Sequence, residues 1–525
     1  MLTDKQSGYR PEHSTQIQLI YLTHNIYKTL DAGNELTAIY LDISKYFDKI
    51  WHDGLLHKCK TDFGLTGPLL TWLKSYLTDR TQQVLIGNTT SAYRTTNAGC
   101  PQGSVLGPLL ALIYLNGLST ETTSDILFFA DDTSLYASHN KDNFIMTQTK
   151  LQQDLDNIQR YGHEWKITFN GTKTIQQTFS LKSTPNIPRL VFDGQTIPIR
   201  DNHKHLGINI SSDLRFKTHV NETIKKVNKA LGPIYPIAKY IPRRILLQIY
   251  TTYIQPYFDY CDTIYDGLIT KTDALRLERL QNRVARLITG TLLRTPTDKL
   301  REELGWATLA NRRKIHKLLL FHHLQTHNPQ IPEYINSILP DTRATQTGRN
   351  LRNSQTLTLA TNRISLFQNS FIPSTTHLWN KLPLSVRQSN HSSFKRLINE
   401  HFGLPRPPEY LTFGSKRNNS LHTRLRLQSS KLNSHLYKLK LVDSPSCSCG
   451  HPSETVEHFI LDCILYDNIR RTLITDISSI LQSNFNLLPK RRQLKILLHG
   501  HHLSQTSGRE VASSFQKYIS NSHRF

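Results

Sequence analysis

The chain has 525 residues, with 64 Lys and Arg against 40 Asp and Glu, so its formal net charge is +24 at pH 7. This length supports several domains, and the longest apolar run, residues 105–115, is too short to cross a bilayer. No amino-terminal secretion signal is visible, so we expect an intracellular chain outside the membrane. A pI near 9.7 favours a nucleic-acid partner, although solubility or attraction to a membrane surface would give the same composition.

A short apolar strand that ends in a carboxylate is predicted first. Residues 39–52 read Ile-Tyr-Leu-Asp-Ile-Ser-Lys-Tyr-Phe-Asp-Lys-Ile-Trp-His, in which the strand ends at Asp42 and a helical stretch follows. Phe47, five residues beyond Asp42, can place a flat ring under a nucleotide sugar and exclude a 2′-hydroxyl. An ordinary core aromatic is the alternative. Asp48 and Asp53 are expected to be surface charges.

A glycine-rich segment follows at residues 99–108, which read Gly-Cys-Pro-Gln-Gly-Ser-Val-Leu-Gly-Pro. Its glycines permit close backbone approach to a ligand. Gln102 can hydrogen-bond a nucleotide or a template there, unless the segment is simply a tight loop. The apolar run 105–115 predicts a buried helix.

The tetrad Phe129-Ala130-Asp131-Asp132 lies between two apolar runs and predicts a hairpin tip with adjacent carboxylates. Together with Asp42 it offers three carboxylates, and such a cluster favours a hard cation such as Mg²⁺. Paired Mg²⁺ ions can stabilise the attacking and leaving oxygens of a phosphoryl transfer. A polar turn without a ligand is the alternative.

A basic face is predicted on one later helix, which is expected to end at Gly290. Arginines recur along it at spacings of three and four residues, and an apolar stripe adjoins them. The arginines are Arg276, Arg279, Arg283 and Arg286, and the apolar residues are Leu277, Leu280, Val284 and Leu287. Such a helix suits a duplex backbone, with an exposed charged face that has no ligand as the alternative.

Three of the six cysteines lie close together near a histidine. Cys447, Cys449, His458 and Cys463 offer four ligands, the number that satisfies tetrahedral Zn²⁺. The odd number of clustered cysteines and the intracellular context disfavour disulfides. His451 in place of His458, or free thiols, are alternatives. Cys59, Cys100 and Cys261 are expected to be small buried apolar residues.

Low apolar content at residues 340–365 and 415–435 predicts loops or partial disorder. Residues 370–394 contain enough large apolar side chains to pack. Beyond the cysteines, residues 490–492 and three histidines make a basic tail that either binds nucleic acid or is merely soluble.

The order of the Asp42, Pro-Gln-Gly and Phe-Ala-Asp-Asp motifs resembles the palm of the reverse transcriptases of non-long-terminal-repeat retrotransposons, of the jockey-like kind. Several further segments add to the resemblance: residues 6–10 with Ser14 and Thr15 (end of the fingers), 165–174 (next palm motif), 205–207 with 213–214 (primer grip), 378–383 (downstream of the thumb) and the Cys/His cluster. Ordered motifs over about two hundred residues make coincidence a poor explanation.

The resemblance implies roles for individual residues. Asp42, Asp131 and Asp132 would hold two Mg²⁺ ions, and Lys173 would donate a proton to the leaving pyrophosphate, unless it is a solvated surface lysine. Arg10 would touch phosphates, and Gly103 would join Gln102 in substrate binding. Tyr46 stands where relatives usually have a small residue and adds bulk beside Phe47.

The implied fold is an α+β right-hand polymerase: an antiparallel palm sheet with helices, partial fingers, a helical thumb and a zinc-knuckle-like module. The expected ranges are 1–34 partial fingers, 35–212 palm, 213–325 thumb, 326–440 a partly disordered connector, 441–475 the Cys/His module and 476–525 a basic tail. In this arrangement the arginine stripe belongs to the thumb.

The implied function is RNA-directed DNA polymerisation in the nucleus, with an RNA template, a DNA primer and deoxynucleoside triphosphates as partners. The chain begins almost at the Gln-x-Gly-Tyr-Arg motif, so an amino-terminally truncated copy of an element is expected. No endonuclease or complete RNase H module is recognised. The alternative is a polymerase-inactive remnant that binds RNA or DNA.

Overall fold

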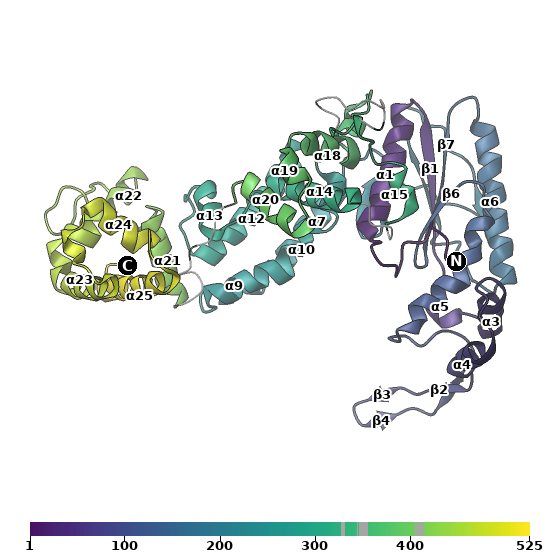
Figure 1. The fold of residues 1–525 in the computed structure, drawn as a ribbon, viewed down its shortest axis with the longest axis horizontal. Helices are drawn as coiled ribbons and strands as arrows, with labels where there is room; N and C mark the ends of the chain where they lie inside the picture. Colours follow the sequence, from purple (N-terminus) through teal and green to yellow (C-terminus); the bar gives the residue numbers. More distant parts are fainter. Residues whose placement is uncertain (327–330, 344, 346–354, 405–407, 409–413) are drawn as a thin grey trace. The chain divides into compact units, whose positions relative to one another are not determined.

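The structure is a computed structural model that describes residues 1–326, 331–343, 345, 355–404, 408 and 414–525 (Figure 1). The chain forms two compact units. The first unit comprises Met1–His219, Cys261–Ile269 and His316–Phe394, and the second comprises Val220–Tyr260, Thr270–Ile315 and Lys395–Phe525. Among the described residues, no helix is long and apolar enough to span a membrane.

A four-stranded antiparallel sheet forms the centre of the first unit. Its strand order is β6 (Asp125–Phe129), β7 (Asp132–His139), β1 (Glu35–Leu41) and β8 (Ile175–Phe179). All seven residues of β1 are buried because the strand has a neighbour on each side and helices over both faces. The predicted antiparallel sheet with helices is therefore confirmed.

Helices cover both faces of this sheet. Figure 1 shows the sheet between α1 (Thr15–Asp31) and α6 (Phe144–Glu164). Ile39 and Leu135 are paired across β1 and β7 and share a buried core with α6, with α5 (Leu106–Leu115) and with α3 (His52–Thr61). Tyr136, the next residue along β7, has its side chain on the other face, where its hydroxyl accepts a hydrogen bond from Asn25 Nδ2 of α1 at 3.2 Å. The buried helix predicted over 105–115 is confirmed as α5.

The outer edge of β6 is covered by an extended segment near the start of the chain. Ser7 N donates to Phe128 O, and Phe128 N donates to Lys5 O, each at 2.9 Å. Gln6 forms a parallel bridge with Phe128. These bonds satisfy main-chain groups that an edge strand otherwise exposes.

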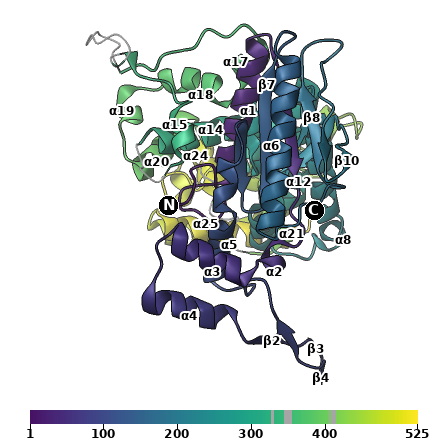
Figure 2. The ribbon, with the colours of Figure 1, turned by 90° about the vertical axis from the view of Figure 1, so that its right-hand side faces the viewer.

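An arm extends from the first unit between α4 (Gly67–Leu77) and α5, and Figure 2 shows its tip, β3 and β4, away from the sheet. The remaining small elements of the first unit are listed by their bounds: α2 (Tyr46–Lys49), β2 (Arg80–Gln82), β3 (Leu85–Ile86), β4 (Thr89–Thr90), β5 (Arg94–Thr96), η1 (Asn116–Thr120), β9 (Val191–Phe192), β10 (Gln195–Thr196), β11 (Asn202–His205) and β12 (Ile208–Ser211). Helix α1 is contacted by four later helices: α11 (Asp262–Tyr265), α15 (Glu333–Asn336), α17 (Ser365–Asn369) and α18 (Phe371–Asn380). Helix α19 (Leu384–Arg387) follows them along the chain. The predicted packing of 370–394 is confirmed by buried Phe371 and Trp379.

The described part of the second unit is built from helices alone. Those that precede residue 315 are α8 (Ile234–Ile237), α9 (Arg243–Ile249), η2 (Tyr250–Ile254), α10 (Pro256–Asp259), α12 (Lys271–Thr289) and α13 (Thr297–Leu304). Those that follow residue 395 are α21 (Lys416–Arg426), α22 (Asn433–Lys438), η4 (His458–Asp462), η5 (Ile464–Tyr466), α23 (Asp467–Leu481), η6 (Phe485–Leu487), α24 (Lys490–His499) and α25 (Gln505–Asn521). Three helices begin in the residue range of one unit and end in that of the other: α7 (Lys217–Leu231), α14 (Leu309–Gln325) and α20 (His391–His401).

The carboxyl-terminal helices share one apolar core. Leu425 of α21, Phe459 beside the cysteines, Ile477 of α23 and Phe515 of α25 are each fully buried in it. The loop predicted over 415–435 is therefore wrong for α21, whose leucines pack inward although most of its residues are polar. Part of the other predicted loop, 344 and 346–354, lies outside the described residues.

Candidate functional site

The three predicted carboxylates lie at one end of the sheet in the first unit. Asp42 directly follows β1, whose last residue, Leu41, pairs with Thr133 of β7. Asp131 lies in the β6–β7 turn, and Asp132 begins β7. The sequence therefore located both the strand end and the hairpin tip that bring these side chains together.

The electrostatics of the three carboxylates indicate a cation site. Burial, then the nearby charge of Asp42, raises the pKa of Asp131. Burial, then the charges of Asp131 and Asp42, raises the pKa of Asp132 to about 6. Oδ2 of Asp42 is buried and has no hydrogen-bond partner among the described residues. A divalent cation would relieve this repulsion, although the oxygens of the three carboxylates do not all lie within 4.8 Å of one another.

Gln6 holds the hairpin tip from the side. Its Oε1 accepts hydrogen bonds from Ala130 N at 2.9 Å and from Gly8 N at 2.7 Å, and its Nε2 donates to Ala130 O at 3.1 Å. Gly8 packs so closely that a Cβ there would lie 2.3 Å from Ala130 N. Ala130 itself has the left-handed φ of 56°. Sequence reasoning did not predict this contact, because Gln6 and Ala130 are 124 residues apart.

The 165–174 segment packs against the end of β1. Asn170 N donates to Asp42 O, and Ser44 N donates to Thr168 O, each at 2.8 Å. These bonds bring Lys173 Nζ to 3.4 Å from Asp42 Oδ2, while the lysine side chain stays 66% exposed. Lys173 therefore lies at the carboxylates and retains access to solvent.

The two aromatic residues of the first motif point to different places. Tyr46 is buried in the core, where its hydroxyl donates to Ala111 O of α5. Phe47 is half-buried, with the ring of Tyr9 edge-on at a centroid distance of 6.2 Å. The additional bulk of Tyr46 is thus accommodated in the core, although its ring still meets that of Phe47 at 5.7 Å.

The glycine-rich segment, residues 99–108, is hydrogen-bonded to α2, the helix that contains Tyr46 and Phe47. Cys100 N donates to Phe47 O at 2.9 Å, and a Cβ on Gly99 would lie 2.7 Å from Asp48 O. Gln102 is exposed, and its Nε2 donates to Asp48 Oδ1 at 2.7 Å. Asp48 is therefore exposed, as expected, but it also orients the glutamine amide.

Arg10 and Gly103 complete the predicted substrate contacts. Arg10 Nη1 donates to Thr3 O at 2.8 Å and to Gln6 O at 3.2 Å, so the guanidinium holds the loop that contains Gln6. Gly103 is exposed and has a positive φ of 80°, which glycine adopts readily.

The arginine stripe lies on α12 of the second unit, which ends at Gly290 as predicted. Leu277, Leu280 and Val284 are buried, whereas Leu287 is half-buried. The four arginines differ: Arg276 pairs with Asp273 at 2.8 Å, Arg286 Nη2 donates to Thr295 O at 3.4 Å, and Arg279 and Arg283 are exposed without a polar contact to any described residue.

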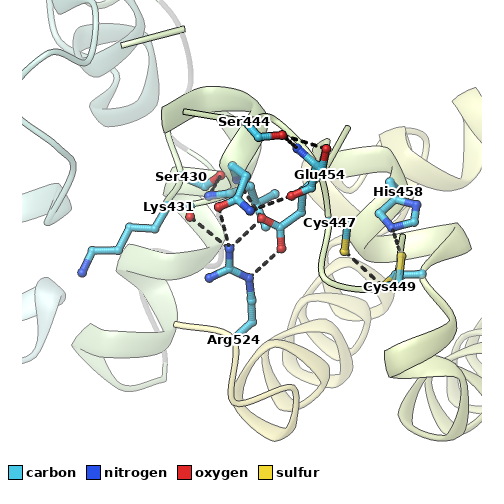
Figure 3. Close-up of polar contacts among 12 residues, drawn as sticks. Ser430, Lys431, Ser444, Cys447, Cys449, Glu454, His458 and Arg524 are labelled. Atoms are coloured by element: carbon cyan, nitrogen blue, oxygen red, sulfur yellow. Dashed lines mark hydrogen bonds and ion pairs between the residues drawn. The ribbon is translucent and has the colours of Figure 1, made fainter. Parts of the chain in front are cut away.

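A Cys/His cluster lies in the second unit. The ligand atoms of Cys447, Cys449, His458 and Cys463 all lie within 4.8 Å of one another. Figure 3 shows His458 directed at Cys449, with 3.2 Å between Nε2 and Sγ, and 3.8 Å separates the sulfurs of Cys447 and Cys463. Four N and S donors in this arrangement fit a tetrahedral metal site.

The loop around the cluster also shows which histidine can act as the fourth metal ligand. Cys447 N donates to His451 O at 2.9 Å, and Gly450 takes a φ of 91° in this tight loop. His451 is exposed and stacks on His458 at a centroid distance of 4.1 Å. His458, not His451, is therefore the imidazole inside the cluster. The isolated Cys59, Cys100 and Cys261 are buried free thiols, as predicted.

Comparisons with known proteins agree with this geometry. A family model described as "Reverse transcriptase (RNA-dependent DNA polymerase)" matches residues 1–210. In Drosophila melanogaster, "Probable RNA-directed DNA polymerase from transposon BS" is 31% identical over 55% of this chain and 33% of its own length. "RNA-directed DNA polymerase from mobile element jockey" from the same organism is 30% identical over 54% of this chain and 32% of its own length. The X-element protein of that organism is 28% identical over 65% of this chain. The chain thus spans about a third of the length of these relatives.

Proposed function

We propose, from the membership of residues 1–210 in the reverse transcriptase family, that this chain adds deoxynucleotides to a DNA primer along an RNA template. The resemblance to jockey-like elements is confirmed by relatives named as the RNA-directed DNA polymerases of jockey, BS and X-element. The observation that supports activity in this chain is the convergence of Asp42 with Asp131 and Asp132 at one end of the sheet. RNA, primer and deoxynucleoside triphosphates are the proposed partners.

In this proposal the four-stranded sheet and its helices are the palm, residues 1–34 belong to the fingers and 213–325 act as the thumb. The limit expected at 475/476 between the Cys/His module and the basic tail falls inside α23, and the helices on both sides of it share one apolar core. Functional ranges and compact units do not coincide, because Cys261–Ile269, within the thumb range, folds with the first unit.

The three carboxylates are proposed to hold two Mg²⁺ ions, as the raised pKa values of Asp131 and Asp132 and the lack of a hydrogen bond to Asp42 Oδ2, whose ion-pair partner is Lys173, support. When bound, such ions stabilise the attacking and leaving oxygens of the transfer. Lys173 Nζ, which lies beside Asp42, is proposed to donate a proton to the leaving pyrophosphate. Its solvent exposure leaves it free to take up a replacement proton.

Substrate selection is proposed to depend on Phe47 and the glycine-rich segment. The half-buried ring of Phe47 would lie against the sugar and exclude a 2′-hydroxyl. Gln102 and Gly103 are exposed and available to a nucleotide or template, and Gln102 would exchange its bond to Asp48 for one to the ligand. Arg10 would reach phosphates only by giving up the carbonyls of Thr3 and Gln6.

The second unit is proposed to grip the nucleic acid. Arg279 and Arg283, which have no partner among the described residues, would contact the phosphates of a duplex, with Arg276 and Arg286 at the ends of the stripe. Cys447, Cys449, His458 and Cys463 are proposed to hold a structural Zn²⁺ ion. The 3.2 Å distance between His458 Nε2 and Cys449 Sγ supports Nε2 as the ligand atom of this histidine.

Primer extension on an RNA template, with deoxynucleotides and Mg²⁺, tests the proposal. The double variant Asp131→Asn/Asp132→Asn should lose extension, since it removes two charges and keeps the side-chain size. The matched control Asp142→Asn/Asp193→Asn removes two exposed carboxylates elsewhere in the first unit and should extend normally. Extension that survives in the first variant would contradict the proposed metal site.

The second candidate function is a remnant that binds RNA or DNA without polymerising. The free arginines of α12 favour it. Retained RNA binding by wild-type protein that extends no primer, at any Mg²⁺ concentration, would select this candidate over the first.

A further inference from the structure

We propose that a basic groove of the second unit, formed by α8, the end of α12 and α21, binds the phosphate backbone of single-stranded RNA. The groove is a cavity of about 580 Å³. All of its lining residues belong to the second unit, so it is distinct from the carboxylates of the first. The choice of RNA as ligand rests on the proposed function; the presence of a polyanion site does not.

The charged side chains of the lining all have one sign. Six of its residues are basic and none is acidic, in a chain that contains 40 acidic residues against 64 basic ones. The basic residues are Lys239, Arg286, Lys416, Arg417, Arg424 and Lys431. Like charges gathered in a concave surface repel one another and raise the local concentration of anions.

Two of these cations build the groove. Lys416 Nζ donates to Ala238 O and to Leu287 O, each at 2.8 Å. Arg424 donates to Gly290 O through Nε at 2.9 Å and through Nη2 at 2.6 Å. They satisfy carbonyls at the carboxyl-terminal ends of α8 and α12, which attract cations. Burial, together with the nearby charge of Arg243, lowers the pKa of Lys416 to about 8.

Three of the other four cations, Lys239, Arg286 and Lys431, have no carboxylate partner among the described residues, whereas Arg417 Nη2 donates to the carboxyl oxygen of Phe525 at 2.9 Å. Lys239, Arg417 and Lys431 are exposed. Figure 3 shows the Lys431 side chain extended away from the neighbouring pair of Glu454 and Arg524, so that carboxylate does not neutralise it.

Arg286 contributes an unsatisfied donor as well as a charge. Its Nη2 makes one long bond of 3.4 Å to Thr295 O, while its Nε is buried and has no hydrogen-bond partner. A buried donor of this kind costs free energy unless a ligand or water accepts from it. Arg286 also lies three residues beyond Arg283 on α12, so the groove continues the arginine stripe.

Two aromatic rings distinguish a nucleic acid from other polyanions. Tyr235, 40% exposed, and Phe525 line the groove beside the cations. Proteins that bind single strands combine a basic groove with rings on which bases stack. Such rings favour a single strand, because its unpaired bases can stack on them, whereas a duplex keeps its bases stacked inside. An acidic peptide would use the charges but not the rings.

The test compares two triple variants of the full chain that remove the same charge. Lys239→Gln/Arg417→Gln/Lys431→Gln alters the groove; Lys440→Gln/Lys495→Gln/Lys517→Gln alters exposed lysines of the same unit outside it. Fluorescence anisotropy with a labelled oligo(U) of about 20 nucleotides gives the affinity at several salt concentrations. Circular dichroism melting verifies that both variants fold.

The groove variant should bind oligo(U) about tenfold more weakly than wild type. The slope of the logarithm of its affinity against the logarithm of the salt concentration should become shallower by about 2, since each phosphate contact of a single strand contributes about 0.7 to that slope. The control variant should bind like wild type. Equal affinity of the two folded variants would overturn the proposal.

A competing polyglutamate peptide of the same charge separates nucleic acid from acidic protein. Weak competition supports RNA, and competition as strong as that of unlabelled oligo(U) overturns the assignment. Primer extension is measured on the same preparations. RNA binding that depends on the groove, without primer extension, would refute the polymerase function and support the groove as an RNA site. Primer extension together with RNA binding that does not depend on the groove would support the polymerase function and refute the groove as an RNA site.

Discussion

The side-chain amide of Gln6 pairs with both main-chain polar groups of Ala130, since Nε2 donates to the carbonyl at 3.1 Å and Oε1 accepts from the N–H at 2.9 Å. Ala130 immediately precedes the two carboxylates of the β6–β7 turn. The amide is buried, and its contact fixes the one residue of this turn that has a positive φ. Gln6 is therefore a positioning residue for Asp131 and Asp132.

Gln6→Ala should impair catalysis more than folding. It leaves the polar groups of Ala130 without partners, which costs about 1–3 kcal/mol of stability, and it frees the turn. Extension should fall at least about tenfold, and half-maximal activity should need more Mg²⁺, because misplaced carboxylates bind the ion less well. The Mg²⁺ titration separates positioning from simple destabilisation, and Gln195→Ala, an exposed glutamine of the same unit, is the control. An unchanged Mg²⁺ requirement would reject the positioning role.

Phe47→Ala should admit ribonucleotides. The half-buried ring is removed, while Tyr46, anchored in the core through its hydroxyl, stays in place. The incorporation ratio of ribonucleotide to deoxynucleotide, measured in single-nucleotide extension, should rise by at least about tenfold, as a lost steric contact is worth about 1–3 kcal/mol. Tyr46→Phe keeps both rings and should leave the ratio unchanged. An unchanged incorporation ratio in Phe47→Ala would contradict the proposed role of the Phe47 ring in the sugar pocket.

Glu35, the first residue of β1, makes the stability of the sheet dependent on pH. Burial alone would raise its pKa, but hydrogen bonds from Lys182, Ser180 and Asn186 outweigh burial and lower it to about 2. Lys182 Nζ and Asn186 Nδ2 each donate to Oε2 at 2.7 Å. Because the pKa is depressed in the folded state, this contribution is present above pH 4.5, the ordinary pKa of a glutamate, and is lost as pH falls towards 2.

Glu35→Gln should therefore destabilise β1 at pH 7 and much less at pH 3. The loss of charge-assisted bonds predicts about 1–3 kcal/mol at pH 7. Hydrogen exchange of the β1 amides at the two pH values measures the free energy of opening. Glu164→Gln, an exposed carboxylate at the end of α6, should show little effect at either pH. Equal destabilisation by Glu35→Gln at both pH values would contradict the charge argument.

Removal of zinc should unfold the Cys/His region and leave the sheet intact. Phe459 and Ile460 lie between the ligands and belong to the core of the carboxyl-terminal helices, so loss of the metal should loosen that core. The expected result of chelation is faster hydrogen exchange over residues 447–463 and unchanged exchange in β6 and β7.

The zinc content of two histidine variants decides between the candidate imidazoles. His458→Ala should lose the bound ion, and His451→Ala, which removes only the stacked ring, should keep about one zinc per chain. Loss of zinc from His451→Ala alone would reverse the assignment of the fourth ligand.

Local sequence predicted the end of the sheet at which the three carboxylates lie, because Asp42 and Asp131 each border a strand that apolar residues define. It could not predict the contact of Gln6 with Ala130, since nothing in either segment identifies a partner so far along the chain. It also missed α21, whose composition is that of a loop. That helix forms because Leu421 and Leu425 are buried in the core and its buried Asn419 accepts a hydrogen bond from Gln516 Nε2 at 2.9 Å.

The segment that contains Gln6 has a second consequence, for solubility. Lys5 and Ser7 bond both main-chain groups of Phe128 on the outer side of β6, a strand that would otherwise offer an open edge to another molecule. A shortened protein that starts after residue 10 would expose this edge. Such a protein should self-associate through strand pairing, so the first ten residues protect the sheet against aggregation as well as shaping its catalytic turn.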